Sequence, residues 1–175
     1  MRVDIYRARG GRIRFEEFTS ETNRTVLIVN GLSGARQRGR VVDEKFVIEE
    51  QTELDALEVE QIKRGVRLYP RNFLAHADEH QYDLSGIQEV GGESVYLLSL
   101  PVEEVAYHFD PETLTCLRMI DRRSDSTTTY EDYREISGVI TPFIERVVQA
   151  QRNFRVDTIK SIDYNLDLED SLFSI

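Results

Sequence analysis

Short β-prone segments that follow one another across very tight turns constrain this chain more than any other feature. Arg2–Arg9 and Arg12–Thr19 flank the pair Gly10-Gly11, and Gly91-Gly92 divides a second pair of segments within residues 81–100. A two-glycine loop of this kind is typical of a β-hairpin. Strands joined by so few residues must be antiparallel, because a parallel crossover needs a dozen or more residues.

Further segments of the same type occupy most of the chain: Thr25–Asn30, Phe46–Glu50, Glu104–Phe109, Leu114–Asp121, Ser126–Arg134, Phe143–Gln151 and Phe154–Tyr164. The turn Asp110-Pro111-Glu112-Thr113 is indicated by proline, which presets φ, and Gly138 and Pro142 divide later segments. We therefore expect a mainly β fold of the α+β class, with one strongly curved antiparallel sheet of about eight to ten strands.

One helix is predicted over Glu53–Arg64, ended by Gly65 and Pro70. Thr52 and Asp55 have the spacing of a capping box. An apolar stripe at helical spacing, which we expect to face the sheet, is formed by Leu54, Leu57 and Ile62. A short helical turn is expected near Asn72–Ala77.

The length of 175 residues fits a single domain over residues 1–175. No apolar run reaches the ~18–20 residues of a membrane span, and residues 1–20 contain no signal-peptide stretch. Any such signal is expected to have been removed or to lie outside this sequence. Cys116 is the single cysteine, so no internal disulfide can form and the redox compartment stays undecided.

The net charge of −10 is unevenly distributed along the chain. Residues 1–40 contain nine arginines against four acidic side chains, whereas the remainder is strongly acidic. Overall acidity argues against nucleic-acid binding, which depends on neutralising phosphates. Arg36, Arg38 and Arg40 would share a face of an extended strand, where they could contact a phosphate head group or simply be solvated.

The motif His76-Ala77-Asp78-Glu79-His80 fits the H-x-x-E-H pattern of zinc peptidases. That chemistry needs a helix, but Gln81–Leu84 begins a β-prone segment at once. In a strand, His76 and His80 would lie about 13 Å apart, too far to share a metal. His108 lies in another β-prone segment, where a surface or pairing role is expected. A zinc hydrolase therefore remains a distant third alternative.

Nucleophilic and nucleotide chemistry are not indicated either. The chain has no G-x-S-x-G motif, and Cys116 lies in a β-prone segment where a buried, inert thiol is expected. Gly31-Leu32-Ser33-Gly34 lacks the Gly-Lys-Ser/Thr of a phosphate-binding loop. We predict no catalytic residue, no metal site and no cofactor.

Several short motifs, in order along the chain, resemble those of one known superfamily. They are Arg12-Ile-Arg-Phe-Glu16, Val29-Asn30-Gly31, Gln88 to Tyr96, Tyr107-His-Phe-Asp110-Pro-Glu-Thr113, Tyr130-Glu-Asp-Tyr-Arg134 with Ile136-Ser-Gly-Val139 and Pro142, and Tyr164 to Phe173. Together they resemble the outer-membrane lipoprotein-sorting proteins, the LolA/LolB-like carriers. The family's N-terminal helix and first strand have no evident counterpart, as expected of a truncated domain or of a divergent member.

The resemblance implies an incomplete β-barrel, with one or two helices covering the concave face, that accepts acyl chains in the periplasm or cell envelope. We accordingly expect a non-enzymatic protein that binds a lipid, an acyl chain or a lipid-modified protein, and possible partners in the envelope. Alternating side chains place apolar residues on one sheet face, and the expected ligand-binding residues are Tyr96, Leu98, Leu100, Tyr107, Phe109, Leu54 and Leu57. The alternative is an interaction or scaffold module of the same fold, whose interior is filled by its own side chains.

Overall fold

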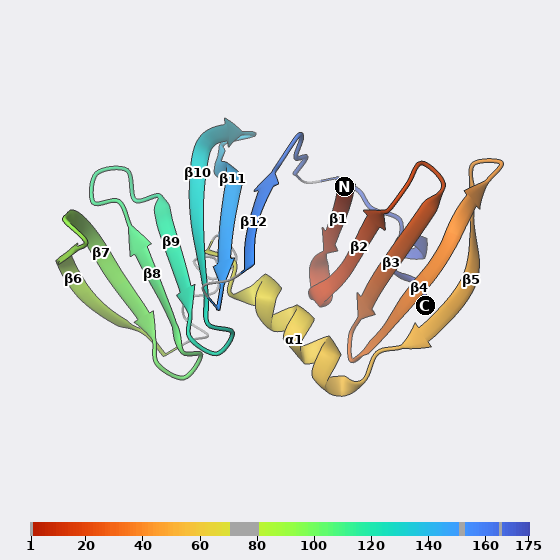
Figure 1. Ribbon diagram of the computed structural model, residues 1–175, viewed down its shortest axis with the longest axis horizontal. Coiled ribbons are helices and arrows are strands. Elements are labelled where there is room, and N and C mark those ends of the chain that lie inside the picture. The colour runs from red at the N-terminus through yellow and green to blue at the C-terminus, as the bar shows by residue number, and fades with distance from the viewer. Residues whose placement is uncertain (1, 71–80, 151–152, 165) are drawn as a thin grey trace. The chain divides into compact units, whose positions relative to one another are not determined.

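The computed structural model describes residues 2–70, 81–150, 153–164 and 166–175. By their internal contacts the residues group into two compact units, residues 1–68 with 167–175, and residues 69–166. Figure 1 labels their strands and the helix α1. The single domain expected over residues 1–175 stays a prediction. No helix in the described parts of the chain has the length and apolar character needed to cross a bilayer.

The first unit contains a five-stranded antiparallel sheet in which the strands follow one another in chain order. Its strands are β1 (Arg2–Ala8), β2 (Arg12–Phe18), β3 (Asn23–Asn30), β4 (Ser33–Val42) and β5 (Lys45–Glu53). The predicted hairpin at Gly10-Gly11 is confirmed: both glycines have positive φ, of 75° and 70°, and a short 3-10 turn, η1 (Arg9–Gly11), joins β1 to β2.

Strand β4 is formed by the glycine-punctuated, arginine-rich segment. Gly39 fits there because a Cβ atom at this position would lie 2.0 Å from the carbonyl oxygen of Val47 on β5. The pairing of β4 with β5 also shifts register between Arg38 and Gly39. Glycine therefore permits a close approach of two backbones at an irregular point of the sheet.

The helix α1 (Ala56–Arg67) begins three residues later than predicted. Its capping box consists of Asp55 and Glu58 rather than Thr52 and Asp55: the Asp55 carboxylate accepts a hydrogen bond from the Glu58 amide, and Glu58 accepts one from the Asp55 amide. The predicted stripe was wrong at Leu57, which is 67% exposed. Val59 is its buried residue, and Ile62 of the predicted stripe packs against the same core.

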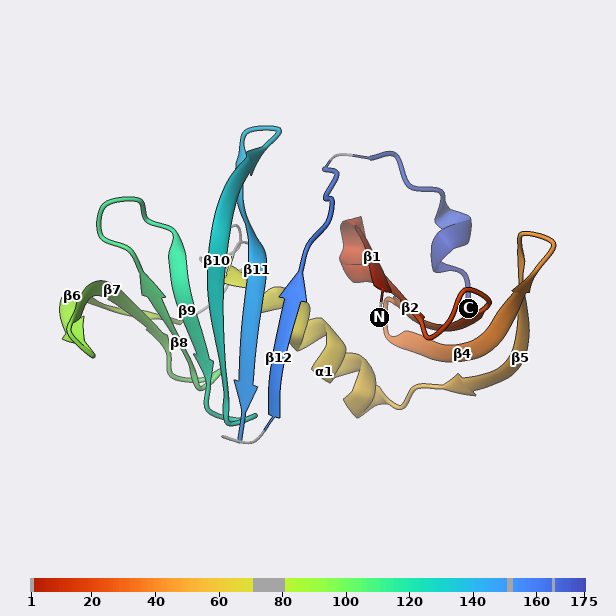
Figure 2. The ribbon, with the colours of Figure 1, turned by 45° about the horizontal axis from the view of Figure 1, so that its top comes forward.

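The helix packs against one face of the five-stranded sheet, and the C-terminal segment covers the other. Val59 forms a core with Ile13, Val29 and Leu54. Ile13 and Val29 are paired across β2 and β3. Their neighbours in sequence point to the opposite face, where residues 167–175 lie, including the short 3-10 helix η3 (Asp170–Phe173). Figure 2 shows the curl of this sheet and the C-terminal segment beside it.

The second unit contains a seven-stranded antiparallel sheet, also in chain order. Its strands are β6 (Asp83–Val90), β7 (Glu93–Leu100), β8 (Val105–Phe109), β9 (Cys116–Asp121), β10 (Ser126–Ile136), β11 (Val139–Gln149) and β12 (Asn153–Thr158). The predicted turns at Gly91-Gly92 and Asp110–Thr113 are confirmed. Pro142 lies inside β11 rather than before it. It pairs with Tyr133 on one side only, since β12 joins the ladder from Ile144 onward, and proline is tolerated where one side needs no amide donor.

The mainly β, antiparallel class is thus confirmed, but the expectation of one continuous sheet was wrong. In the described residues the strands form two sheets, of five and seven strands. The separation falls between β5 and β6, and α1 lies between these two strands in the chain. The helical turn predicted at Asn72–Ala77 and the motif His76–His80 lie outside the described residues.

Candidate functional site

Five of the seven predicted ligand-binding residues lie together on one face of the seven-stranded sheet. Tyr96 pairs with Phe109, Leu98 pairs with Tyr107, and Leu100 pairs with Val105. Tyr107 has no exposed surface, and its ring centroid lies 6.1 Å from that of Phe109. Most of this face is therefore core packing, and a charge at Leu98 would be placed inside that core.

The other two predicted residues belong to the first unit. Leu54 is buried between α1 and the five-stranded sheet, where its Cδ1 atom would lie 2.8 Å from a Cβ atom at Gly34. Leu57 is exposed to solvent. Neither Leu54 nor Leu57 is among the residues that line the hollow beside Phe109.

Phe109 borders a cavity of about 280 Å³ in the second unit. The turn after β8, the beginning of β9, and parts of β10 and β11 enclose it, together with residues that follow α1. Its lining is dominated by aromatic and aliphatic side chains: Tyr69, Pro70, Phe109, Thr113, Leu114, Thr115, Cys116, Tyr130, Tyr133, Ile140 and Pro142.

Three tyrosines contribute to the cavity wall, and their hydroxyl groups are held by the protein. Tyr69 donates to the Glu145 carboxylate at 2.8 Å and meets the Tyr130 ring edge-on, with centroids 5.9 Å apart. Tyr133 donates to the backbone carbonyl oxygen of Cys116. Burial raises the pKa of both Tyr130 and Tyr133, so these phenols stay neutral. The cavity is therefore uncharged along this wall.

The irregular backbone of β10 places two of these tyrosines on the same cavity. Residues three apart in a regular strand point to opposite faces. Between Tyr130 and Tyr133, however, Asp132 takes a positive φ of 54° and has no partner in the β10–β11 ladder. This break in the alternation is the reason that the sequence pattern did not identify Tyr130 and Tyr133 as lining one site.

The mouth of the cavity carries two exposed aliphatic side chains. Leu114 is 63% exposed and Ile140 is 52% exposed. Leu114 has a φ of 57°, and its amide donates to the carbonyl oxygen of Asp110 at 2.9 Å. The Asp110 carboxylate accepts hydrogen bonds from the Thr113 amide and hydroxyl and from the Glu112 amide, and these bonds lower its pKa. The turn is thus held by its own hydrogen bonds with Leu114 exposed.

The cavity's thiol is not arranged for nucleophilic attack. Burial raises the pKa of Cys116 from 9.0 to about 12, and its Sγ donates to the carbonyl oxygen of Arg118 at 3.4 Å. A thiolate, rather than a thiol, is the reactive form. His108 is buried rather than on the surface, and burial together with Arg118 lowers its pKa. Within the described ranges, no three His, Cys, Asp or Glu side chains cluster as metal ligands.

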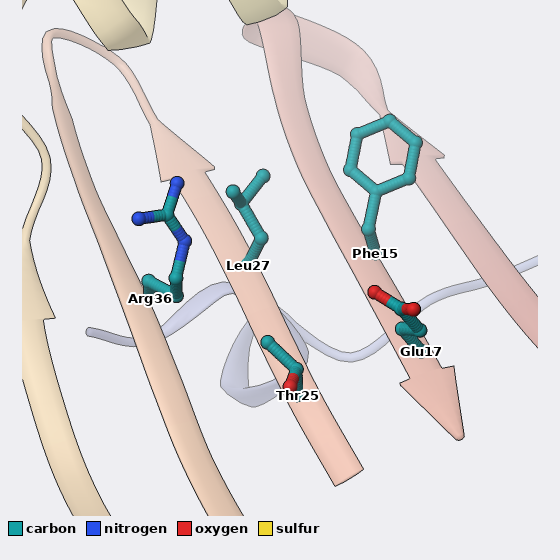
Figure 3. A pocket seen from close by; sticks show the side chains of 5 residues that line it. All are labelled: Phe15, Glu17, Thr25, Leu27 and Arg36. Atoms are coloured by element: carbon teal, nitrogen blue, oxygen red, sulfur yellow. The ribbon is translucent and has the colours of Figure 1, made fainter. Parts of the chain in front are cut away.

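A second hollow, of about 310 Å³, lies on the helix-covered face of the first unit. Figure 3 shows its lining, which consists of Phe15, Glu17, Thr25, Leu27 and Arg36. Phe15 and Leu27 are paired across β2 and β3 and pack against the helix core. Arg36 lies 3.5 Å from the Glu58 carboxylate. Unlike the cavity beside Phe109, this hollow has charged side chains, Glu17 and Arg36, in its lining.

The three arginines that could have formed a phosphate site are each paired with a glutamate. Arg36 lies beside Glu58, Arg38 beside Glu50 at 3.5 Å, and Arg40 beside Glu49 at 2.9 Å. These pairs are solvent-accessible, so they contribute little to stability. Their charges are balanced locally instead of being gathered on one anionic group.

Comparisons with known proteins describe the fold. No protein-family model matches this chain, and no curated protein is significantly similar to it. The crystal structure of a DUF1329 family protein from Desulfovibrio piger ATCC 29098 is similar over 98% of this chain and 86% of its own, with a TM-score of 0.53 and 17% identity. A LolA superfamily protein from Nitrosomonas europaea is similar over 94% and 81%, with a TM-score of 0.44 and 13% identity.

The likeness to the DUF1329 family protein from Desulfovibrio piger concerns the fold. That fold is mainly antiparallel β, with one α-helix in the described residues. At these identities the likeness concerns the fold, and the function has to be argued from the site.

Proposed function

We propose that this protein is a non-enzymatic binding protein of the periplasm or cell envelope that holds an acyl chain or a similarly apolar ligand in the cavity bordered by Phe109. The observation that carries the proposal is the cavity's composition. Its tyrosine hydroxyl groups at positions 69 and 133 are occupied by hydrogen bonds to the protein. Aromatic rings and aliphatic groups are left to meet a ligand, as in most small-molecule sites.

The size of the cavity limits what it can hold. Ligand pockets commonly occupy roughly 300–1,000 Å³, and a volume of about 280 Å³ lies just below that range. We propose that the cavity takes one end of a chain and that the remainder lies across the exposed Leu114 and Ile140 at the mouth. Each buried methylene contributes about 0.8 kcal/mol before ordering costs.

An interaction or scaffold module is the second candidate, and a specific observation favours it. The sheet face expected to line a ligand cavity is largely filled, since Tyr107, Leu100 and Leu98 are buried by the protein itself. In this alternative, the hollow beside Phe109 would remain empty of lipid. An envelope protein would then be the partner rather than a lipid or lipid-modified protein.

A fluorescent fatty-acid titration separates the two candidates. A dansyl-labelled fatty acid should bind the wild-type protein saturably and be displaced by unlabelled fatty acid. Ile140→Glu places a carboxylate at the mouth and should weaken binding at least about tenfold, because desolvating a charge beside an acyl chain is unfavourable. Ile140 is 52% exposed, so the folded state should tolerate the change.

Ile87→Glu is the matched control. Ile87 lies on β6 of the same unit, is 56% exposed and does not line the cavity. This variant should bind the probe as the wild type does. Equal loss of binding in both variants, or no saturable binding by the wild type, would contradict the proposed lipid site and favour the scaffold role. Lipid extraction and mass spectrometry of the purified protein would identify any retained ligand.

A further inference from the structure

The C-terminal segment, residues 167–175, occupies a defined site on the first unit. It lies on β2 and β3, on the sheet face opposite α1. Phe173 has no exposed surface, so its ring is fully enclosed by this unit. The segment therefore binds the sheet as a short peptide would, with one aromatic side chain as its anchor.

Polar side chains of the sheet recognise both the backbone and the charge of the segment. Arg14 Nη1 donates to the carbonyl oxygen of Leu172 at 2.9 Å, and Asn30 Nδ2 donates to that of Phe173 at 3.3 Å. The Arg12 guanidinium pairs with the Asp170 carboxylate and lies 5.0 Å from the centroid of the Phe173 ring. Arg12 therefore contacts both the acidic side chain and the aromatic anchor.

The recognition site is held by interactions within the sheet itself. Glu16 is buried and accepts from Arg14 Nε at 2.6 Å and from Arg24 Nη1 at 2.7 Å. The Arg24 guanidinium in turn lies 4.6 Å from the centroid of the Phe18 ring. Arg14 is thus oriented by Glu16 while its other nitrogen reaches the segment. Such preorganisation lowers the cost of ordering the site when a peptide binds.

Charge also matches between the site and the segment. Arg12 and Arg14 of β2 contact the segment, and its acidic side chains are Asp167, Glu169 and Asp170. The described residues between β12 and η3, 159–164 and 166–169, contain no helix or strand. The described residues of this connection are therefore irregular, and the contacts of the segment with the sheet are those that a separate peptide could make.

We propose that this face of the first unit is a peptide-recognition site for an acidic residue followed, after two residues, by Phe. The C-terminal segment occupies it within the chain, and a partner protein carrying the same pattern occupies it in exchange. Two side chains define the pattern: the Asp170 carboxylate, which pairs with Arg12, and the buried Phe173 ring. Between them, the site contacts the main-chain carbonyl oxygen of Leu172. This site is independent of the cavity beside Phe109.

The test uses the full-length chain with Phe173→Ala, which removes the anchor of the resident segment. A fluorescein-labelled peptide with the sequence of residues 167–175 is titrated against it by fluorescence anisotropy. Saturable binding is expected, and the wild-type chain should bind at least about tenfold more weakly, because its own segment competes at a high effective concentration. A peptide with Phe173→Ala should lose at least about tenfold in affinity.

A charge exchange tests the pairing of Arg12 with Asp170. Arg12→Asp, placed in the Phe173→Ala chain, should weaken binding of the native peptide about two- to fivefold, as expected for an accessible ion pair. A peptide with Asp170→Arg should be weakened similarly against the unaltered site and should regain affinity for the Arg12→Asp chain. Arg2→Asp is the control, since Arg2 pairs with Asp4 and lies over the Phe18 ring, and both of these partners belong to the sheet rather than to the segment.

Folding is checked by circular dichroism and by cooperative urea unfolding. If Phe173→Ala does not fold, Asp170→Arg in the full-length chain replaces it, because the Asp170 side chain is 89% exposed. In that variant the native peptide should bind more tightly than it binds the wild type. The proposal is overturned if the folded variant binds no peptide saturably, or if binding is unchanged when the peptide carries Phe173→Ala.

Discussion

The hydroxyl group of Tyr133 donates a hydrogen bond to the backbone carbonyl oxygen of Cys116, across a sequence separation of 17 residues. Tyr133 belongs to β10 and Cys116 is the first residue of β9. The backbone pairing of β10 with β9 ends at Thr129 and Arg118. The Tyr133 bond joins the two strands beyond that point, beside the cavity. It therefore ties the cavity wall to the sheet.

Removing this hydroxyl group should destabilise the second unit with little change in cavity shape. Tyr133→Phe leaves the Cys116 carbonyl without its side-chain donor and should lower the free energy of unfolding by about 1–2 kcal/mol. Urea unfolding measures the loss. Tyr82→Phe is the control, because Tyr82 is exposed and its change should stay within about 0.5 kcal/mol. Equal stability of the two variants would show that the Tyr133 bond contributes nothing.

High pH should destabilise the protein through groups that burial keeps protonated. Burial raises the pKa of Cys116 from 9.0 to about 12, and it raises the pKa of Tyr130 and Tyr133 as well. Above about pH 9 the unfolded chain therefore releases protons that the folded chain retains. Stability should be at its plateau below this pH and fall as pH rises toward 12, with a slope of up to about 1.4 kcal/mol per pH unit for each such group.

Urea unfolding between pH 7.5 and 10.5 measures this slope. Cys116→Ala removes the thiol and should give a shallower decline, while the tyrosines still contribute. At pH 8, the native thiol should react much more slowly with a disulfide reagent than the thiol of the urea-unfolded chain, because the thiolate is the reactive form. A free energy of unfolding that does not change with pH, or rapid native labelling, would contradict this account of Cys116.

Two glycines of the first unit should respond in opposite directions to the same substitution. At Gly34 a Cβ atom would lie 2.8 Å from Leu54 Cδ1 and 3.0 Å from the Ile28 carbonyl oxygen, so Gly34→Ala should cost about 1–3 kcal/mol. Gly65 lies in α1 with nothing within 4 Å of that position. Gly65→Ala should stabilise by about 0.5–1 kcal/mol, because alanine favours helix. Thermal unfolding of both variants tests the packing of β4 against the helix region.

Local signals in the sequence were enough to predict most of the hairpins. Gly10-Gly11 and Gly91-Gly92 form turns with positive φ, and each turn joins two antiparallel strands as predicted. The division into two sheets was not predicted, because each hairpin signal concerns only neighbouring strands. The interruption after β5 carries no strong turn signal of its own, and the helix there was predicted without its effect on strand pairing.

The candidate site was only partly predictable, for reasons of backbone geometry. Alternation placed Tyr96 and Leu98 on one face of their strand, and Tyr107 and Phe109 on one face of theirs. The pairing of β7 with β8 brings these two sets onto the same face of the sheet. Alternation alone does not tell a filled face from a hollow one, and only Phe109 among these residues borders the cavity. Leu114 and Asp132 take positive φ values that are uncommon for such residues. The sequence pattern does not indicate those conformations, so the mouth and the tyrosine wall were not predicted.

The buried carboxylate of Glu16 should contribute far more to stability than an exposed carboxylate in a similar pair. Glu16 bonds Arg14 at 2.6 Å and Arg24 at 2.7 Å. Glu16→Gln keeps the side-chain volume but leaves two largely buried guanidinium groups without their counter-charge, at an expected cost of about 3 kcal/mol. Glu131→Gln is the matched control, because Glu131 bonds Arg146 at 2.7 Å at an accessible position. Its cost should be below about 1 kcal/mol.

Chemical unfolding at low and high salt distinguishes the pairs, since salt screens exposed charges more than buried ones. If the two variants lose equal stability with equal salt dependence, Glu16 does not hold Arg14 and Arg24 in the manner described.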